Sequence, residues 1–312
     1  MSSVSEGRFR SSAVPLITPG AARTTLLTDD GVPLEALYEP RAPYEPEPCA
    51  PGSEAPDGTA IVIAHGFTGS LDRPAVRRAA RVLGRRAPVI TFSFRGHGGS
   101  GGRSTVGDRE VLDLAAAVRW ARLLGHRRVV TVGFSMGGSV VLRHGALYAA
   151  GPAGHGAAAE AGAAGHVPTA AAATGADASA RADAVVAVSA PARWYYRGTA
   201  PMRRLHWLVT RPTGRLVGRY GFGTRIDRDD WDPVPLSPVE AAGLIAPAPL
   251  LIVHGDRDPY FPLDHPRMLA EAAGDGAELW LEPGMGHAEN AADESLLTRV
   301  ADWAAACSMM DS

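Results

Sequence analysis

The chain has 312 residues, of which 46% are hydrophobic and 21% are charged, proportions typical of one large globular domain or two small ones. A formal net charge of −2 argues against a role in binding nucleic acid or an acidic membrane surface. Cys49 and Cys307 are the two cysteines, too few for a disulfide framework or a metal cluster. The first residues lack the apolar core of a signal peptide, and no apolar run is long enough to span a bilayer. We therefore expect a cytoplasmic protein with no integral membrane segment.

The amino-terminal part reads as an arm followed by a hairpin. Residues 1–23 predict a flexible arm, and residues 24–312 are expected to form the folded domain. Within residues 24–39, two apolar-rich runs flank the turn sequence D-D-G, which is typical of a β-hairpin. Residues 40–58 are rich in proline and glutamate and predict an exposed linker.

From Thr59 onward, apolar runs alternate with amphipathic stretches. The expected strands are 60–65, 88–94, 128–133, 184–189, 250–254 and 278–281. The expected helices are 72–85, 106–124, 136–149, 264–273 and 291–306. This alternation indicates an α/β fold, with crossover helices on both faces of a mostly parallel sheet.

Residues 151–182 interrupt this rhythm. The segment is mostly alanine, glycine and threonine, with scattered prolines, and we expect a disordered insertion. His155 and His166 are interpreted as solvated loop residues, because no cluster of metal ligands accompanies them. A long surface loop costs little free energy, so the insertion is not expected to disturb the remaining fold.

The sequence G-F-S-M-G at 133–137 lies where a β-branched run gives way to an apolar helix. A sharp strand-to-helix turn exposes the hydroxyl of its central serine, and bulky flanking side chains would clash there, which explains the glycines. The following helix directs its N-terminus at the same point, where developing negative charge is stabilised. Ser135 is therefore a candidate nucleophile.

A serine hydroxyl needs a base, and the base needs an orienting acid. Two later loops each follow an expected strand, one containing H-G-D-R-D-P and the other G-M-G-H. Open α/β sheets place their chemistry at such strand ends. His287 is the candidate base and Asp258 the candidate acid, and the chain order Ser135, Asp258, His287 is the one this architecture uses.

Asp256 competes with Asp258 for the role of the acid. We favour Asp258, because Asp256 lies nearer the strand end and reads as a turn residue bonding its own backbone. The other histidines in these loops have structural interpretations: His254 closes a strand, His97 shapes a glycine-rich loop and His65 holds a turn.

Two backbone N–H groups are candidate donors to an oxyanion. One belongs to Met136, directly after the serine. The other belongs to Phe67 in H-G-F-T-G, where Gly66 allows the backbone a close approach to a substrate. We expect these two amides to form the oxyanion hole.

Taken together, these motifs resemble the α/β-hydrolase superfamily. The matching pieces are H-G-F-T-G at 65–69, F-R-G-H-G-G-S at 94–100, G-F-S-M-G-G at 133–138, H-G-D-R-D-P-Y-F-P at 254–262 and G-M-G-H at 284–287. The chain looks most similar to esterases, lysophospholipases and monoacylglycerol-lipase-like hydrolases. The resemblance implies the α/β-hydrolase fold, with a central sheet of about eight strands and a small helical cap at 192–246.

Aromatic residues mix with arginines in the expected cap. One interpretation is an acyl-binding lid with a basic rim, to which Met202, Trp207 and Leu208 contribute. The other is a small helical cap that buries its own aromatics beneath solvated arginines. Sequence alone favours the second.

The sequence therefore predicts a serine hydrolase that cleaves a small-molecule carboxylic ester through an acyl-enzyme intermediate, without a metal or organic cofactor. Two alternatives stay open. The same triad serves peptidases, acyltransferases, C–C bond hydrolases and perhydrolases, and some proteins of this fold only bind ligands. The oligomeric state and the identity of the acyl and alcohol groups are not predicted.

Overall fold

A computed structural model describes residues 20–41, 58–149 and 177–307. Most of the arm expected at 1–23 lies outside these ranges. The same holds for Cys49 and for the greater part of the expected insertion at 151–182, including both of its histidines.

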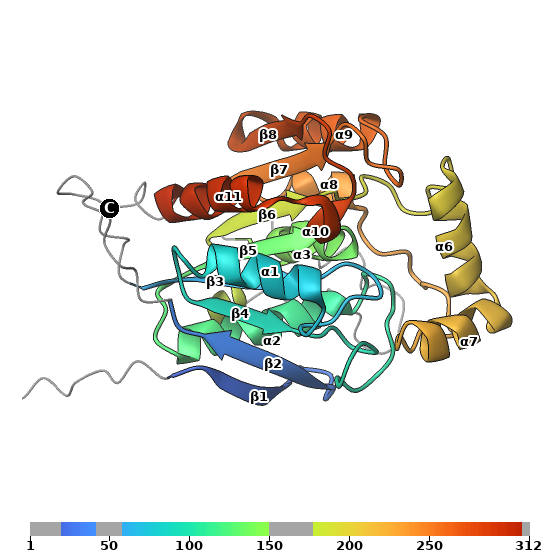
Figure 1. The fold of residues 1–312 in the computed structure, drawn as a ribbon, viewed down its shortest axis with the longest axis horizontal. Coiled ribbons are helices and arrows are strands. Elements are labelled where there is room, and N and C mark those ends of the chain that lie inside the picture. The colour runs from blue at the N-terminus through green and yellow to red at the C-terminus, as the bar shows by residue number, and fades with distance from the viewer. Residues whose placement is uncertain (1–19, 42–57, 150–176, 308–312) are drawn as a thin grey trace, which may run out of the picture.

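Eight strands form one sheet, in the order β1-β2-β4-β3-β5-β6-β7-β8 (Figure 1). They are β1 Ala22–Leu27, β2 Pro33–Glu39, β3 Thr59–Ala64, β4 Val89–Phe92, β5 Arg128–Phe134, β6 Ala184–Val188, β7 Leu250–Gly255 and β8 Ala277–Glu282. β2 pairs antiparallel with β1 and β4, and every other pairing is parallel. The predicted hairpin and the mostly parallel sheet are confirmed.

Helices cover both faces of the sheet. One face carries α1 Pro74–Leu83, α10 Ala288–Ala291 and α11 Glu294–Cys307, and the other carries α2 Glu110–Leu123, α3 Met136–Leu147, α8 Pro238–Ala242 and α9 Asp264–Ala273. Two short 3₁₀ helices, Ala178–Ala180 and Gly274–Gly276, precede β6 and β8. Consecutive residues of a strand point to opposite faces of the sheet. Val62 therefore packs into the apolar cluster on one face, and Ile63 packs into the cluster on the other. This explains why the central strands are apolar throughout.

Two helix predictions need correction. The helix expected from residue 106 begins at Glu110, because the Glu110 carboxylate accepts hydrogen bonds from Thr105 and Gly107 and holds that segment as a loop. The helix expected at 291–306 is α11, which begins at Glu294 because the short α10 before it ends at Ala291.

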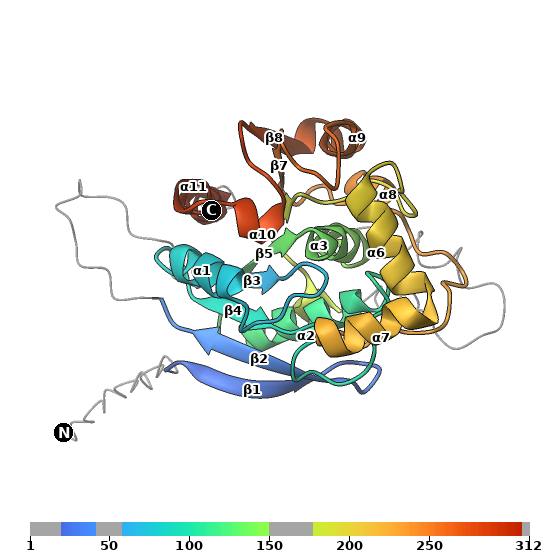
Figure 2. The ribbon, with the colours of Figure 1, turned by 45° about the vertical axis from the view of Figure 1, so that its right-hand side comes forward.

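Two helices of the expected cap, α6 Ala200–Thr210 and α7 Pro212–Gly221, stand apart from the sheet (Figures 1 and 2). Arg211 is extended before Pro212, which separates the helices because a residue before proline disfavours the helical conformation. The range 192–246 also contains α8, which packs against α3 and α9. Among the described residues, no helix is both long and apolar enough to cross a bilayer.

Candidate active site

Ser135 lies in the turn between β5 and α3. Its φ of 52° is positive, a conformation that costs free energy for any residue except glycine. A Cβ atom on Gly133 would collide with the carbonyl oxygen of Gly137, and one on Gly137 would collide with that of Ala64. The glycines around the serine are thus required by close backbone packing, as the motif predicted.

His287 lies between Ser135 and Asp258. Its Nε2 is 2.9 Å from the Ser135 Oγ, and its Nδ1 is 2.7 Å from Oδ2 of Asp258. The three residues come from the loops after β5, β7 and β8, which end at one edge of the sheet. The structure therefore brings together the three side chains that the motifs singled out, in hydrogen-bonding order.

The Asp258 carboxylate is buried and held by backbone amides. Its Oδ1 accepts hydrogen bonds from the N–H groups of Tyr260 and Phe261, at 2.8 and 3.1 Å. Burial would raise the pKa of Asp258, but the hydrogen bonds from His287 and these amides outweigh it, so the pKa lies below its usual value. The carboxylate is therefore ionised and can orient the imidazole ring.

The role expected of Asp256 is corrected. Asp256 does not bond its own turn: its Oδ1 accepts from the N–H of Gly284 at 2.6 Å, which ties the loop after β7 to the loop of His287. The turn with an aspartate side chain bonded to the amide two residues later is instead formed by Asp258 and Tyr260.

Two residues that support His287 were missed by the sequence analysis. The Tyr260 ring stacks on the imidazole at a centroid distance of 4.2 Å. Ser189, at the end of β6, accepts a hydrogen bond from the N–H of Ala288 at 3.0 Å. Its position directly after a strand, on the same sheet edge, was the signal that could have revealed it.

The loop after β3 forms a tight turn beside the serine. Gly69 donates to the Gly66 carbonyl at 2.9 Å, and Thr68 has a φ of 63°. The N–H groups of Phe67 and Met136 make no hydrogen bond within the described ranges. They are available as the two expected donors to an oxyanion.

His65 holds this turn in place, as expected. Its Nε2 accepts from the Phe94 N–H at 3.0 Å, so its Nδ1 carries the proton that is donated to the Gly66 carbonyl at 2.7 Å. Burial lowers the pKa of His65 to about 3, which keeps this tautomer neutral.

Two cavities open on Ser135. The first has a volume of about 550 Å³ and lies between the segment before α6, α6 itself and the loop around Trp231. The second has a volume of about 570 Å³ and is bordered by His287, α6 and α7. Four apolar side chains line both: Phe67, Met202, Leu205 and Phe261.

Comparison with known proteins identifies the family. The family model described as "Alpha/beta hydrolase family" matches residues 61–302. The chain belongs to this family. No curated protein matches the chain.

Solved structures share this alpha/beta hydrolase fold at low sequence identity. An esterase from Pyrococcus furiosus is 20% identical, with a TM-score of 0.60 over 96% of this chain and 98% of the other. A serine hydrolase without a lid from Xanthomonas campestris is 18% identical, with a TM-score of 0.55 over 96% and 100%. A Butyrivibrio proteoclasticus protein with bound ferulic acid is 19% identical, with a TM-score of 0.51 over 90% and 96%.

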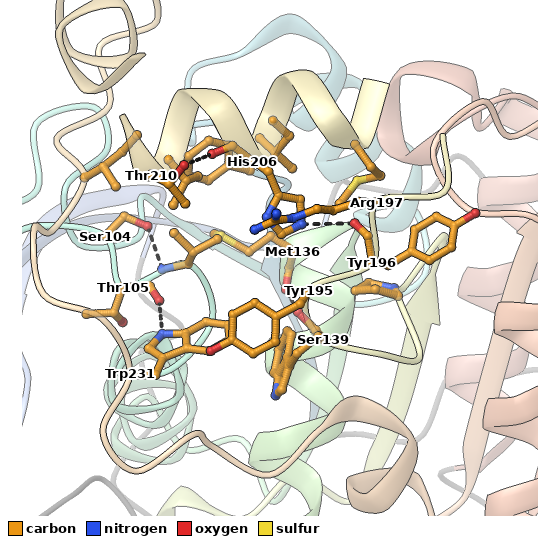
Figure 3. Close-up of a pocket in the computed structure, with 18 of the residues that line it drawn as sticks. Ser104, Thr105, Met136, Ser139, Tyr195, Tyr196, Arg197, His206, Thr210 and Trp231 are labelled. Atoms are coloured by element: carbon orange, nitrogen blue, oxygen red, sulfur yellow. Dashed lines mark hydrogen bonds between the residues drawn. The ribbon is translucent and has the colours of Figure 1, made fainter. Parts of the chain in front are cut away.

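Aromatic rings form much of the first cavity of this alpha/beta hydrolase (Figure 3). The Trp231 ring lies 4.9 Å from that of Trp194 and 5.5 Å from that of Tyr195, measured between centroids. Trp231 Nε1 donates to the Thr105 carbonyl at 2.7 Å, which fixes the indole in the wall. One wall of the cavity is therefore aromatic and held in place.

All three cap residues named for an acyl pocket border the second cavity. Met202 borders both cavities, but Trp207 and Leu208 border only the second, on the side of His287. No group of three histidine, cysteine, aspartate or glutamate residues in the described part of the chain could hold a metal ion.

Proposed function

We propose that this alpha/beta hydrolase cleaves a carboxylic ester through an acyl-enzyme intermediate. The observation that carries the proposal is the hydrogen-bonded series of Ser135, His287 and Asp258 at the mouth of two cavities. A nucleophile, a base and an orienting acid in contact are the parts that acyl transfer needs.

In the first half of the reaction, Ser135 Oγ attacks the ester carbonyl while His287 Nε2 takes its proton. The ionised carboxylate of Asp258 fixes the tautomer of His287 and stabilises the imidazolium that forms. The amides of Phe67 and Met136 stabilise the oxyanion. The alcohol then leaves with the proton from His287, and the acyl group stays on Ser135.

In the second half, water enters the place of the alcohol. His287 takes a proton from the water as it attacks the acyl carbon, and returns that proton to Ser135 Oγ when the carboxylic acid leaves. Each proton moves through one nitrogen, Nε2, which faces the serine. No metal or organic cofactor is required for either half.

The solved structures support the choice of an ester. One neighbour is an esterase, and another holds ferulic acid, an aromatic carboxylic acid of the kind that ester cleavage releases. The aromatic wall of the first cavity suits an acyl group of this size.

A series of p-nitrophenyl esters with increasing acyl length tests the proposal. We expect turnover by the wild-type chain and a loss of at least about 10⁴-fold in kcat for Ser135→Ala, because the nucleophile is removed. Ser179→Ala is the matched control, since Ser179 is an exposed serine before β6, away from the carboxyl ends of the strands. Its turnover should equal that of the wild type.

The reaction of Ser135 with a fluorophosphonate separates the alternatives. Labelling without ester turnover would reject the ester and point to amide, C–C or acyl-transfer chemistry. A folded protein that is neither labelled nor active would instead be a ligand-binding member of the family.

A further inference from the structure

One hydroxyl of the cap contacts the loop that carries Asp258. Thr199 is the N-cap residue of α6, and its Oγ1 accepts a hydrogen bond from the N–H of Met202 at 3.4 Å. The same Oγ1 donates its proton to the backbone carbonyl of Tyr260 at 2.9 Å. Among the described residues, this is the one hydrogen bond that joins α6 and its N-cap to the loop after β7. The cap is therefore tied to the sheet edge directly beside the triad.

The carbonyl that accepts this bond belongs to a peptide group that also bonds the Asp258 carboxylate. This peptide joins Tyr260 to Phe261, and its N–H donates to Asp258 Oδ1 at 3.1 Å. A trans peptide group is planar, so its C=O and its N–H point in opposite directions and turn together. A rotation that took the carbonyl away from Thr199 would therefore also take the N–H away from the carboxylate.

Hydrogen bonds that follow one another in a series also strengthen one another. A donor at the C=O of a peptide polarises the amide, which makes its N–H a better donor. In the described part of the chain, the Tyr260 carbonyl accepts from Thr199 and from no other group. Beyond the peptide, Asp258 Oδ2 lies 2.7 Å from His287 Nδ1, and His287 Nε2 lies 2.9 Å from Ser135 Oγ. The Thr199 hydroxyl is thus the outer end of a series that reaches the nucleophile.

The N-cap of α6 uses only one side of this hydroxyl. An N-cap side chain accepts a hydrogen bond from the first turn of its helix, and this explains the bond from Met202. The proton of the hydroxyl is not needed for the cap of the helix, and it is this proton that Tyr260 accepts. Met202 and Phe261 both border the two cavities, so the link lies where the cap meets the space for a substrate.

We propose that Thr199 is a positioning residue, which fixes the peptide between Tyr260 and Phe261 and thereby the carboxylate of Asp258. This inference rests on the proposed function, in which that carboxylate orients His287. Thr199 touches no reacting atom, so loss of its hydroxyl should slow the chemical step and leave substrate binding nearly unchanged. The cap then contributes to the rate of the reaction as well as to the selection of the substrate.

Steady-state kinetics of four variants and the wild type on one p-nitrophenyl ester tests this role. Thr199→Val removes the hydroxyl with little change in shape, and we expect kcat to fall about fivefold while KM stays within about twofold. Thr199→Ser keeps both hydrogen bonds and should hold kcat within about twofold of wild type. Thr210→Val is the matched control, because the Thr210 hydroxyl donates to the His206 carbonyl of the same helix. Its kcat and KM should equal those of the wild type.

The fourth variant, Thr199→Asp, separates the two bonds of the hydroxyl. Its carboxylate is a good N-cap acceptor for the Met202 N–H, but it has no proton to donate to the Tyr260 carbonyl. If the N-cap alone matters, Thr199→Asp should match the wild type. The positioning role predicts instead a loss of kcat at least as large as that of Thr199→Val. The comparison of Thr199→Asp with Thr199→Ser does not depend on how Thr199→Val folds.

The rate of labelling by a small fluorophosphonate is the second measurement, because it reports the reactivity of Ser135 without an ester. The variants should rank in the same order as they do by kcat. A wild-type kcat in Thr199→Val or Thr199→Asp, a loss confined to KM, or a Thr199→Ser variant as slow as Thr199→Val would each reject the role of Thr199.

The same measurement keeps the two proposals apart. If Ser135 is labelled but no ester is hydrolysed, the proposed function fails, and the labelling rates of the variants still decide the role of Thr199. A folded chain that is neither labelled nor active would reject both proposals.

Discussion

The edge of the sheet and the cap above it are built differently. At the sheet edge, the carboxylate of Asp258 is buried and held by two backbone amides, and Ser135 is fixed between β5 and α3. In the cap, α6 and α7 bury few side chains and leave large apolar ones exposed, Tyr220 at 78% and Leu216 at 56%.

The sheet edge is suited to the chemical step, and the cap is suited to the selection of the substrate. Acyl transfer needs donors and acceptors placed to within a few tenths of an ångström, which buried strand ends provide. Selection of an acyl or alcohol group needs a surface whose side chains can change without unfolding the protein. Met202 and Leu205 of α6 meet both cavities, so the cap reaches the substrate where the sheet edge supplies the reaction.

The largest effect is expected where two aspartates of one loop are compared. Asp258→Asn should lower kcat by about 10⁴-fold, because an amide cannot hold His287 in the required tautomer. Asp256→Asn should lower it less than about tenfold, since an amide oxygen can still accept from Gly284. Steady-state kinetics on one p-nitrophenyl ester measures both, and similar losses for the two variants would contradict the assignment.

The sheet edge was largely predictable from sequence. Strand ends bring motifs together whatever their separation along the chain, so Ser135, Asp258 and His287 could be assigned from their positions after apolar runs. The roles of the two aspartates were harder, because the Asp256 contact with Gly284 joins two loops and has no local signature.

The cap was predicted only as a range of residues. Its helices follow from prolines and short periodic stretches, but which side chains face which cavity depends on how α6 and α7 lie over the sheet. Trp207 belonged to the acyl-lid interpretation, which the sequence did not favour, and its place beside the cavity of His287 could not be predicted. The burial of Glu289, which accepts a hydrogen bond from the N–H of Gly66, was not predicted, because a glutamate two residues after a histidine carries no pattern that reveals it.

Packing should show the next largest contrast. Leu142, in α3, is fully buried, and Leu142→Ala should lower the free energy of unfolding by about 2–5 kcal/mol through lost burial and the cavity that remains. Leu216→Ala, in α7, should change it by less than about 0.5 kcal/mol. Denaturant titration by circular dichroism checks the pair. A comparable loss for both would show that the cap packs as tightly as the sheet.

Acyl selection should depend on the cavity wall more than on the reactive residues. Trp231→Ala removes an indole that contacts Trp194 and Tyr195, so kcat/KM for p-nitrophenyl benzoate should fall about tenfold relative to that for the acetate. Tyr220→Ala, at an exposed ring outside both cavities, is the control and should leave this ratio unchanged. Equal losses on both esters would place the acyl group elsewhere.

The last contrast concerns histidines of the two regions under acid conditions. His144, in α3, is fully buried, and burial lowers its pKa to about 3. The unfolded chain binds a proton there near the ordinary pKa of 6.5, so between about pH 6.5 and pH 3 it holds more protons than the folded chain. The stability therefore falls as the pH falls through this window, by about 2 kcal/mol between pH 7.5 and pH 5 for this residue.

His206, in α6, is half-buried, and its pKa is lowered mainly by burial but to a smaller extent. His144→Met should remove its share of the acid sensitivity, and His206→Met should remove less. Urea titrations at pH 7.5 and pH 5 on the wild type and both variants give the two differences. If His206→Met removed the larger share, the loss of stability in acid would come mainly from the cap. The buried His144 beside the sheet would then not be its main source.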